Sequence, residues 1–165
     1  MTISEALLLE FDQEVTNTRK TLERVPEKPD FVPHSKSMPL GRLAAHVAEL
    51  AGFGLSVLTT QLVDFSTGSY KPLPFESAAQ LVRVFDEGAA TVRRALIDTA
   101  DEAWKANWRL VYKGKAIFDG PRFLAYREMF LNHLVHHRAQ LGVYLRLNGV
   151  PVPAIYGPSA DEPFA

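Results

Sequence analysis

Three of the five histidines in the chain, His133, His136 and His137, lie within one short stretch. His133 and His137 are separated by about one turn of an α-helix, so their imidazoles project from the same helical face. One zinc ion can accept a nitrogen from each imidazole at about 2.0–2.1 Å. The HExxH motif uses this spacing, but Leu134, Val135 and His136 occupy the intervening positions and its glutamate base is missing. The pattern favours a metal site and argues against a zincin-like protease.

A helical wheel at about 100° per residue orients the side chains of segment 122–148. His133 and His137 straddle the centre of an apolar arc that also holds Phe123, Met129, Phe130, Leu141 and Leu147. His136 falls towards one edge and is expected to be exposed. Tyr126 and Tyr144 fall on the histidine face, where they are either pocket hydroxyls or ordinary core rings.

A third imidazole is available from His46, on the apolar face of a helix expected over residues 39–64. Leu43, Leu50, Phe53 and Val57 fall within about 60° of it on the same wheel. A buried histidine is often a hydrogen-bonded core residue, but two imidazoles on one apolar face need partners for their nitrogens. Three imidazoles with open coordination positions would make a catalytic type of metal site.

Other polar residues near these histidines carry weaker expectations. Gln140 either orients a ligand or is a polar residue at the edge of the bundle. Arg138 is expected on the surface or at an interface, whereas Glu49 and Glu128 are expected to be solvated charges rather than catalytic bases. His34, among prolines, is expected in a loop.

Four amphipathic helices are expected, over residues 4–24, 39–64, 76–99 and 122–148, separated by stretches rich in proline, glycine and serine. No convincing β-repeat is present, so the pattern predicts an all-α four-helix bundle in one domain, residues 1–165. The connection 101–121 is irregular and either forms a short hairpin around Lys113 and Gly114 or lies across the bundle. The last sixteen residues form a proline-rich tail that docks on the bundle or on a second subunit.

The composition narrows the possible functions. The chain contains no cysteine, which excludes disulfides, zinc–thiolate sites and a cysteine nucleophile. Its net charge of −1 gives no reason to expect nucleic acid or an anionic membrane as a partner. The N-terminus lacks the basic start of a signal peptide, and no membrane-length apolar run is present. A cytoplasmic location is therefore expected.

Two segments resemble the DinB/YfiT-like proteins, a family of metalloenzymes with a four-helix bundle fold. They are "MPLGRLAAHVAEL" (38–50) and "NHLVHHRAQLGVYLRLNGVPVPAIYGPSADE" (132–162), and the second contains the pattern HxxxHRxQL. The resemblance covers essentially the whole chain and implies a metal triad of His46, His133 and His137. It further implies a divalent transition metal (nickel, zinc or iron) and homodimerisation through bundle helices. Characterised relatives include transferases and isomerases that use low-molecular-weight thiols, and some hydrolases.

The leading functional expectation is a metal-dependent enzyme whose three-histidine site activates a low-molecular-weight thiol, as in an S-transferase, acting on a small-molecule substrate. A hydrolase that uses metal-bound water is the close alternative. A third possibility is a non-catalytic, metal-binding, stress-associated dimer. Three histidines suit several first-row ions, so the sequence specifies neither the metal nor the substrate.

Overall fold

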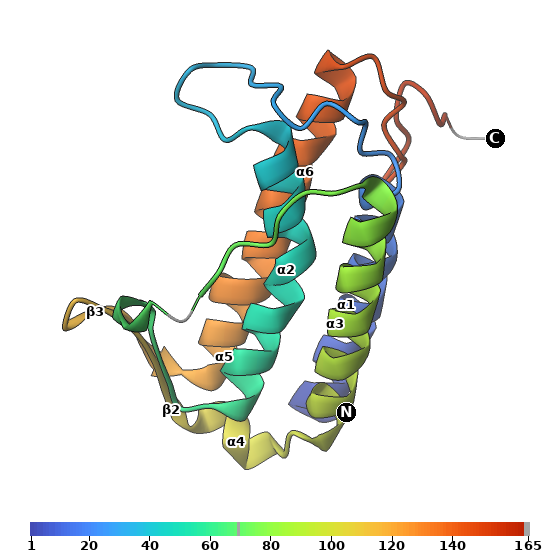
Figure 1. The fold of residues 1–165 in the computed structure, drawn as a ribbon. Coiled ribbons are helices and arrows are strands. Elements are labelled where there is room, and N and C mark those ends of the chain that lie inside the picture. The colour runs from blue at the N-terminus through green and yellow to red at the C-terminus, as the bar shows by residue number, and fades with distance from the viewer. Residues whose placement is uncertain (69, 164–165) are drawn as a thin grey trace.

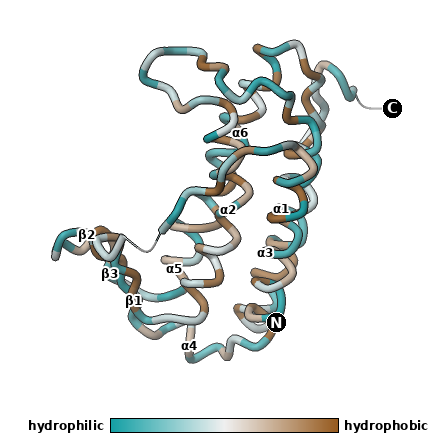
Figure 2. The backbone as a smooth tube through the Cα atoms, in the orientation of Figure 1, coloured by the Kyte–Doolittle hydropathy of each residue, from teal (hydrophilic) through white to brown (hydrophobic). Residues whose placement is uncertain are grey.

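The computed structural model describes residues 1–68 and 70–163. Within these residues the chain is mostly helical, with four long helical segments lying side by side (Figure 1). They are α1 (Ile3–Leu22), α2 (Leu40–Thr59), α3 (Ala78–Asp98), and a continuous segment made of α5 (Arg122–Ala125), η2 (Tyr126–Leu131) and α6 (Asn132–Leu147). Helices therefore form in all four of the predicted ranges. Hydrophobic and hydrophilic positions are interspersed along α1 and α3 (Figure 2), and most of the large apolar side chains face the common core.

The helix starts are stabilised in different ways. Thr2 caps α1 in a capping box with Glu5, and the Ser77 hydroxyl accepts a hydrogen bond from the backbone N–H of Gln80 at the start of α3. Helix α2 follows Pro39 and has no side-chain cap. Instead, the backbone N–H groups of Leu40 and Gly41 donate to carbonyls of the preceding loop at 2.8 and 2.9 Å. This loop thus satisfies two of the otherwise unpaired N–H groups at the start of the helix that carries His46.

A small sheet lies beside the helices, so the prediction of an all-α fold is wrong in this respect. In the described part of the chain it has three strands in the order β1 (Leu62–Asp64), β2 (Asn107–Tyr112), β3 (Lys115–Pro121). Strand β1 pairs in parallel with β2, which pairs antiparallel with β3. The hairpin of the 101–121 segment turns at Lys113 and Gly114, which have φ values of 49° and 74°.

The sheet corrects two boundaries drawn from the sequence. Helix α2 ends at Thr59, and Leu62–Asp64 is a strand rather than the end of a helix. A short helix, α4 (Asp101–Lys105), precedes the hairpin, and a 3₁₀ turn, η1 (Phe65–Thr67), follows β1. Trp108 and Leu110 alternate inward along β2 and are buried, which joins the sheet to the helical core.

Arg122 joins the two helical segments that carry the histidines. Its guanidinium is buried and donates to the carbonyls of Leu58 and Thr60 at 3.1 and 2.6 Å, and also to that of Val57. These carbonyls belong to the C-terminal end of α2, where the helix dipole favours a positive charge. Burial lowers the pKa of Arg122. The start of the last helical segment is thereby attached to the end of α2.

The segment η2 is a π-helix, and it changes the helical phase ahead of α6. The backbone N–H of Asn132 donates to the carbonyl of Arg127, five residues earlier, where an α-helix would use the fourth. A helical wheel that uses one constant step for residues 122–148 therefore gives wrong directions for the residues before η2 relative to those of α6. The side of α6 that faces the core lies about 80–140° from His133 on that wheel. It carries Leu134, Arg138, Leu141 and Leu145, all buried.

Candidate metal centre

The three predicted ligands come together. His46 projects from α2, and His133 and His137 project from α6. Their ring centroids are 4.6 Å apart for the two pairs that include His137 and 5.3 Å for His46 and His133. One nitrogen from each imidazole can be chosen so that all three lie within 4.8 Å of one another. The cluster therefore has the composition and dimensions to hold a metal ion.

The outer nitrogens of the rings are hydrogen-bonded. His46 Nδ1 lies 3.3 Å from Glu49 Oε1, and His137 Nδ1 lies 2.8 Å from Gln140 Oε1, so in each case the ring N–H donates to the oxygen. The His133 ring hydrogen-bonds the backbone of Met129. Because His133 Nε2 faces His46, Nδ1 is the nitrogen left for that bond. This network assigns the tautomers and leaves the Nε2 lone pairs for the centre of the cluster.

The facing nitrogens provide a test of whether a metal fits. Nε2 of His46 and Nε2 of His133 are 3.3 Å apart. With both Nδ1 atoms acting as donors, two lone pairs face each other with no hydrogen between them, an arrangement that a cation relieves. Two nitrogens bound tetrahedrally at 2.0–2.1 Å from one ion would be about 3.4 Å apart. The observed separation and donor set therefore fit a divalent transition metal ion.

The electrostatics keep two of the imidazoles neutral. Burial lowers the pKa of His133, and the neighbouring His46 lowers it further. Burial also lowers the pKa of His137 to about 4, and the surrounding histidines contribute in the same direction. A metal ligand must be the neutral imidazole, so at neutral pH these two rings do not need to lose a proton before binding.

Glu49 is the functional residue that the sequence reasoning missed. It was expected to be a solvated charge, but its side chain is only 15% exposed and accepts hydrogen bonds from His46, Arg42, Tyr70 and the backbone of Leu73. Burial alone would raise the pKa of Glu49, but these hydrogen bonds outweigh it and hold the pKa at about 2. Its position three residues after a candidate ligand was the available signal, because residues i and i+3 are neighbours on a helix.

Gln140 contacts two histidines. Its Oε1 accepts from His137, and its Nε2 donates to His136 Nε2 at 3.1 Å. His136 is exposed, as expected, and its ring packs 4.8 Å from that of His137. Gln140 thus lies where it can orient His137, the role considered for it from the sequence.

The two tyrosines have other neighbours. The buried ring of Tyr126 packs against Trp104 and Phe130, and its hydroxyl has no hydrogen-bond partner among the described residues. The Tyr144 hydroxyl donates to the carbonyl of Met38 at 2.9 Å, and its ring lies against Phe31. The structure records no contact of either tyrosine with the described histidines. Tyr126 precedes the phase change at η2, so the wheel gave it the wrong direction. Tyr144 shares a face of α6 with the histidines but lies about two helical turns beyond His137, where it cannot reach the cluster.

Arg138, which was expected on the surface or at an interface, is buried within the chain between α6 and α1. It is 3% exposed and forms a buried ion pair with Glu14 of α1. The Thr18 hydroxyl accepts from the same guanidinium at 3.2 Å, and Tyr156 of the tail contacts both members of the pair. Because Arg138 directly follows His137, this buried contact fixes the rotation of α6 about its own axis.

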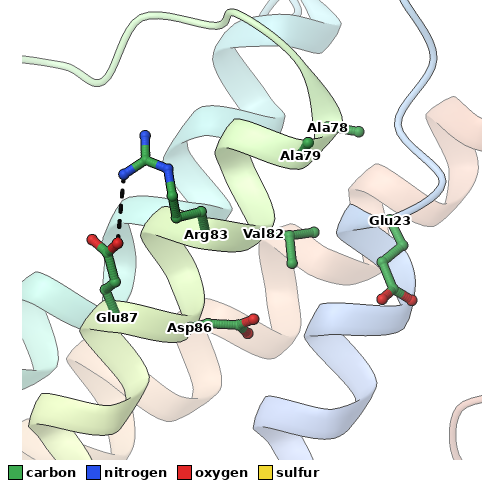
Figure 3. Close-up of a pocket in the computed structure, with 7 residues that line it drawn as sticks. All are labelled: Glu23, Ala78, Ala79, Val82, Arg83, Asp86 and Glu87. Atoms are coloured by element: carbon green, nitrogen blue, oxygen red, sulfur yellow. Dashed lines mark hydrogen bonds and ion pairs between the residues drawn. The ribbon is translucent and has the colours of Figure 1, made fainter.

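The histidine cluster lies at the edge of the core. Its three residues are half-buried. The buried side of α6 packs against α1, and His133 and His137 lie on a different side of the helix. An open groove of about 540 Å³ lies elsewhere, between α1 and α3, lined by Glu23, Ala78, Ala79, Val82, Arg83, Asp86 and Glu87 (Figure 3). Its lining contains no histidine, so it is separate from the candidate metal centre.

The sequence model of the DinB family matches residues 4–163. The chain belongs to the DinB family. Among relatives of this DinB-family chain, the uncharacterized protein YrdA of Bacillus subtilis (strain 168) is 26% identical over 131 residues, covering 78% of this chain and 72% of that protein.

Solved structures show the same fold for this DinB-family chain. A DinB-like protein from Bacillus cereus ATCC 10987 aligns with a TM-score of 0.69 at 22% identity, covering 92% of this chain and 97% of that one. The DinB-like protein YjoA from Bacillus subtilis gives 0.66 at 16% identity, with 90% and 96% covered. A protein from Exiguobacterium sibiricum 255-15, assigned to the DinB family, gives 0.62 at 24% identity, with 90% and 94% covered.

Proposed function

We propose that this DinB-family chain is a metal-dependent enzyme of the thiol S-transferase type. His46, His133 and His137 would hold a divalent transition metal ion, nickel, zinc or iron, through their Nε2 atoms. The observation that carries the proposal is the approach of Nε2 of His46 to Nε2 of His133 at 3.3 Å, with the opposite nitrogens tied to other groups. A site with three protein ligands at the edge of the core leaves coordination positions open to a small molecule.

A metal ion bound there would lower the pKa of a coordinating thiol and stabilise its thiolate. The sulfur would have to come from a separate molecule, because the chain has no cysteine. In the transfer, the sulfur forms a bond to an electrophilic carbon of the substrate and the leaving group departs with its bonding electron pair. The thiol proton is released to solvent.

The protein's own groups would fix the ligand rings. Glu49 orients His46, and its negative charge offsets part of the positive charge of the ion. Gln140 orients His137, and the Met129 backbone orients His133. These contacts hold the rings before the ion binds, which reduces the entropy lost on binding.

Hydrolysis through a metal-activated water is less well supported. That reaction profits from a carboxylate base beside the metal. Glu49 is the carboxylate in contact with the described cluster, but four donors occupy its lone pairs and a pKa of about 2 makes it a weak base. Glu128 is exposed. These observations favour the external thiol as nucleophile.

The proposal also covers the domain organisation, the oligomeric state and the cellular location. We expect one domain over residues 1–165, a homodimer and a cytoplasmic location. Among the residues that the structure describes, no helix is both long and apolar enough to span a membrane. Size-exclusion chromatography with light scattering tests the dimer.

The function is tested by titrating low-molecular-weight thiols into protein loaded with cobalt(II). Direct coordination predicts a new sulfur-to-cobalt absorption band in the wild type and none in His137→Ala. Turnover of thiol with a panel of electrophiles, epoxides and activated halides among them, then distinguishes an enzyme from a metal-binding protein. Metal-loaded protein that gives no thiol band and no turnover would contradict the proposal and favour a non-catalytic role.

A further inference from the structure

A segment without helix or strand crosses α2 on its way to α3 (Figure 1). It comprises residues 70–77 and is called the strap below. The Tyr70 hydroxyl donates to Glu49 Oε1, and the backbone N–H of Leu73 donates to Glu49 Oε2 at 2.8 Å. Both oxygens of the carboxylate that holds His46 are thus bonded to the strap.

The sequence of the strap suits this attachment. Pro72 and Pro74 flank Leu73. Neither proline has a backbone N–H, and their fixed φ angles limit the conformations available when the strap is detached. Docking on Glu49 therefore costs less conformational entropy than it would for an ordinary loop.

The strap is also anchored close to α3. Gln80 Nε2 donates to the carbonyl of Pro74 at 2.9 Å, and Leu73 packs against the hydrophobic core. A methyl group in place of the Gly41 hydrogen would lie 3.2 Å from the Cβ of Phe75, so the strap runs close to the backbone of α2. The contact with Glu49 is therefore part of a defined path across α2.

Tyr70 acts mainly through its hydroxyl. The residue is 54% exposed, so its ring contributes little to the core, whereas its hydroxyl lies between Glu49 and the guanidinium of Arg42. Arg42 donates to the Tyr70 oxygen at 2.7 Å and to Glu49 Oε1 at 2.8 Å. Together these contacts hold the carboxylate in one orientation, with Oε1 directed at His46.

We propose that Tyr70 is a positioning residue for the metal site and that docking of the strap is coupled to metal binding through Glu49 and His46. The inference rests on the proposed metal function. A docked strap fixes Glu49, which fixes the ring of His46 with Nε2 towards the ion. By linkage, an ion that holds His46 in this orientation stabilises the docked strap by the same free energy.

The test compares Tyr70→Phe with the wild type, using zinc alone. The dissociation constant, measured by competition with a chromophoric chelator, is expected to rise about tenfold, the lower end of the range for loss of a hydrogen-bonding partner close to a ligand. The visible spectrum of the cobalt(II) form is expected to change, because His46 is less well oriented. Tyr112→Phe is the matched control, an exposed tyrosine on β2.

Hydrogen exchange of peptides covering residues 70–77 provides the reciprocal measurement. Zinc is expected to slow this exchange in the wild type and in Tyr112→Phe, and to slow it less in Tyr70→Phe. Equal dissociation constants, or equal slowing of exchange, in Tyr70→Phe and the wild type would overturn the inference while leaving the metal site intact. A wild-type protein that binds no zinc would overturn the proposed function, and the inference with it.

Discussion

The three candidate ligands differ in the group that holds each ring. His46 is bonded to a carboxylate, His137 to a side-chain amide and His133 to the backbone. A carboxylate acceptor is the strongest of the three because it carries a full negative charge. Among these contacts, the one between Glu49 and His46 should therefore contribute most to metal affinity.

The first prediction is that Glu49→Gln weakens metal binding by about 10- to 100-fold. The substitution removes the negative charge. It also places an NH₂ group, which cannot accept a hydrogen bond, where a carboxylate oxygen now accepts from neighbouring donors. Isothermal titration of the apoprotein with zinc measures the change. Glu128→Gln, at an exposed glutamate of the same charge, should leave the affinity unchanged. Equal affinity in both variants would rule out this role for Glu49.

The second prediction concerns the pH dependence of the apoprotein. The folded pKa of His137 is about 4, below the value of about 6.5 for an unfolded histidine. Its neutral form is favoured by folding, so its contribution to stability is complete above about pH 6.5 and is lost as the pH falls towards 4. The urea midpoint should fall across this range, and less steeply in His137→Gln. Parallel profiles for the two proteins would contradict the expectation.

At the residue scale, the sequence predicted the histidine cluster better than its surroundings. One-turn spacing selected the pair of His133 and His137. The apolar face of residues 39–64, together with the family resemblance, added His46. Glu49 was expected in solvent and Arg138 on the surface or at an interface, because a wheel describes one helix and contains no information about its neighbours. Glu49 is covered by the strap, and Arg138 faces the buried Glu14 of α1.

At the element scale, α2 and η2 approach each other closely at Gly54 and Phe130. Gly54 makes this possible, because a Cβ at that position would lie 2.7 Å from the ring of Phe130. Gly52, two residues earlier in the same helix, is exposed and has nothing within 4 Å of the same hypothetical atom. The two glycines therefore allow a matched comparison.

The third prediction is that Gly54→Ala destabilises the fold by about 1–3 kcal/mol, because the methyl group overpacks the contact with Phe130. Gly52→Ala should instead stabilise it by about 0.5–1 kcal/mol, because alanine loses less backbone entropy in a helix. Denaturant unfolding of the two variants measures both changes. Changes of the same sign in the two variants would show that α2 and η2 do not meet at Gly54.

The fourth prediction concerns the contact between α1 and α6. Arg138→Met leaves the buried Glu14 carboxylate without its ion-pair partner and should cost about 3–5 kcal/mol. Arg83→Met removes an exposed ion pair with Glu87, at 3.5 Å, and should change stability by less than about 1 kcal/mol. Denaturant unfolding of each variant and of the wild type measures these changes in the free energy of unfolding. A small loss in Arg138→Met would indicate that the pair does not fix α6.

The elements could be predicted from the sequence to different degrees. The long helices follow from the period of their apolar residues. The hairpin of β2 and β3 was one of the two alternatives considered for residues 101–121. Strand β1 was missed because it has only three residues and its parallel pairing with β2 depends on contacts distant in the sequence. The π-helix was missed because its apolar pattern resembles that of an α-helix, and only its hydrogen bonds differ.

At the scale of the whole molecule, the family fold brings two distant parts of the chain to one site. His46 and His133 are 87 residues apart in the sequence, and their Nε2 atoms are 3.3 Å apart. The tail, which was expected to dock on the helices or on a second subunit, contacts its own chain. Glu162 pairs with Arg24 and Asp161 pairs with Arg146, so the C-terminal segment joins the ends of α1 and α6.

The most direct test of metal binding by the three histidines is the metal content of the purified protein, measured by inductively coupled plasma mass spectrometry. We expect about one divalent transition metal ion per wild-type chain and a large loss in His137→Ala, because two imidazoles alone bind such an ion weakly. His34→Ala, in an exposed loop, should retain the wild-type content. If wild type and His137→Ala hold equally little metal after zinc or nickel loading, the three histidines do not form a metal site.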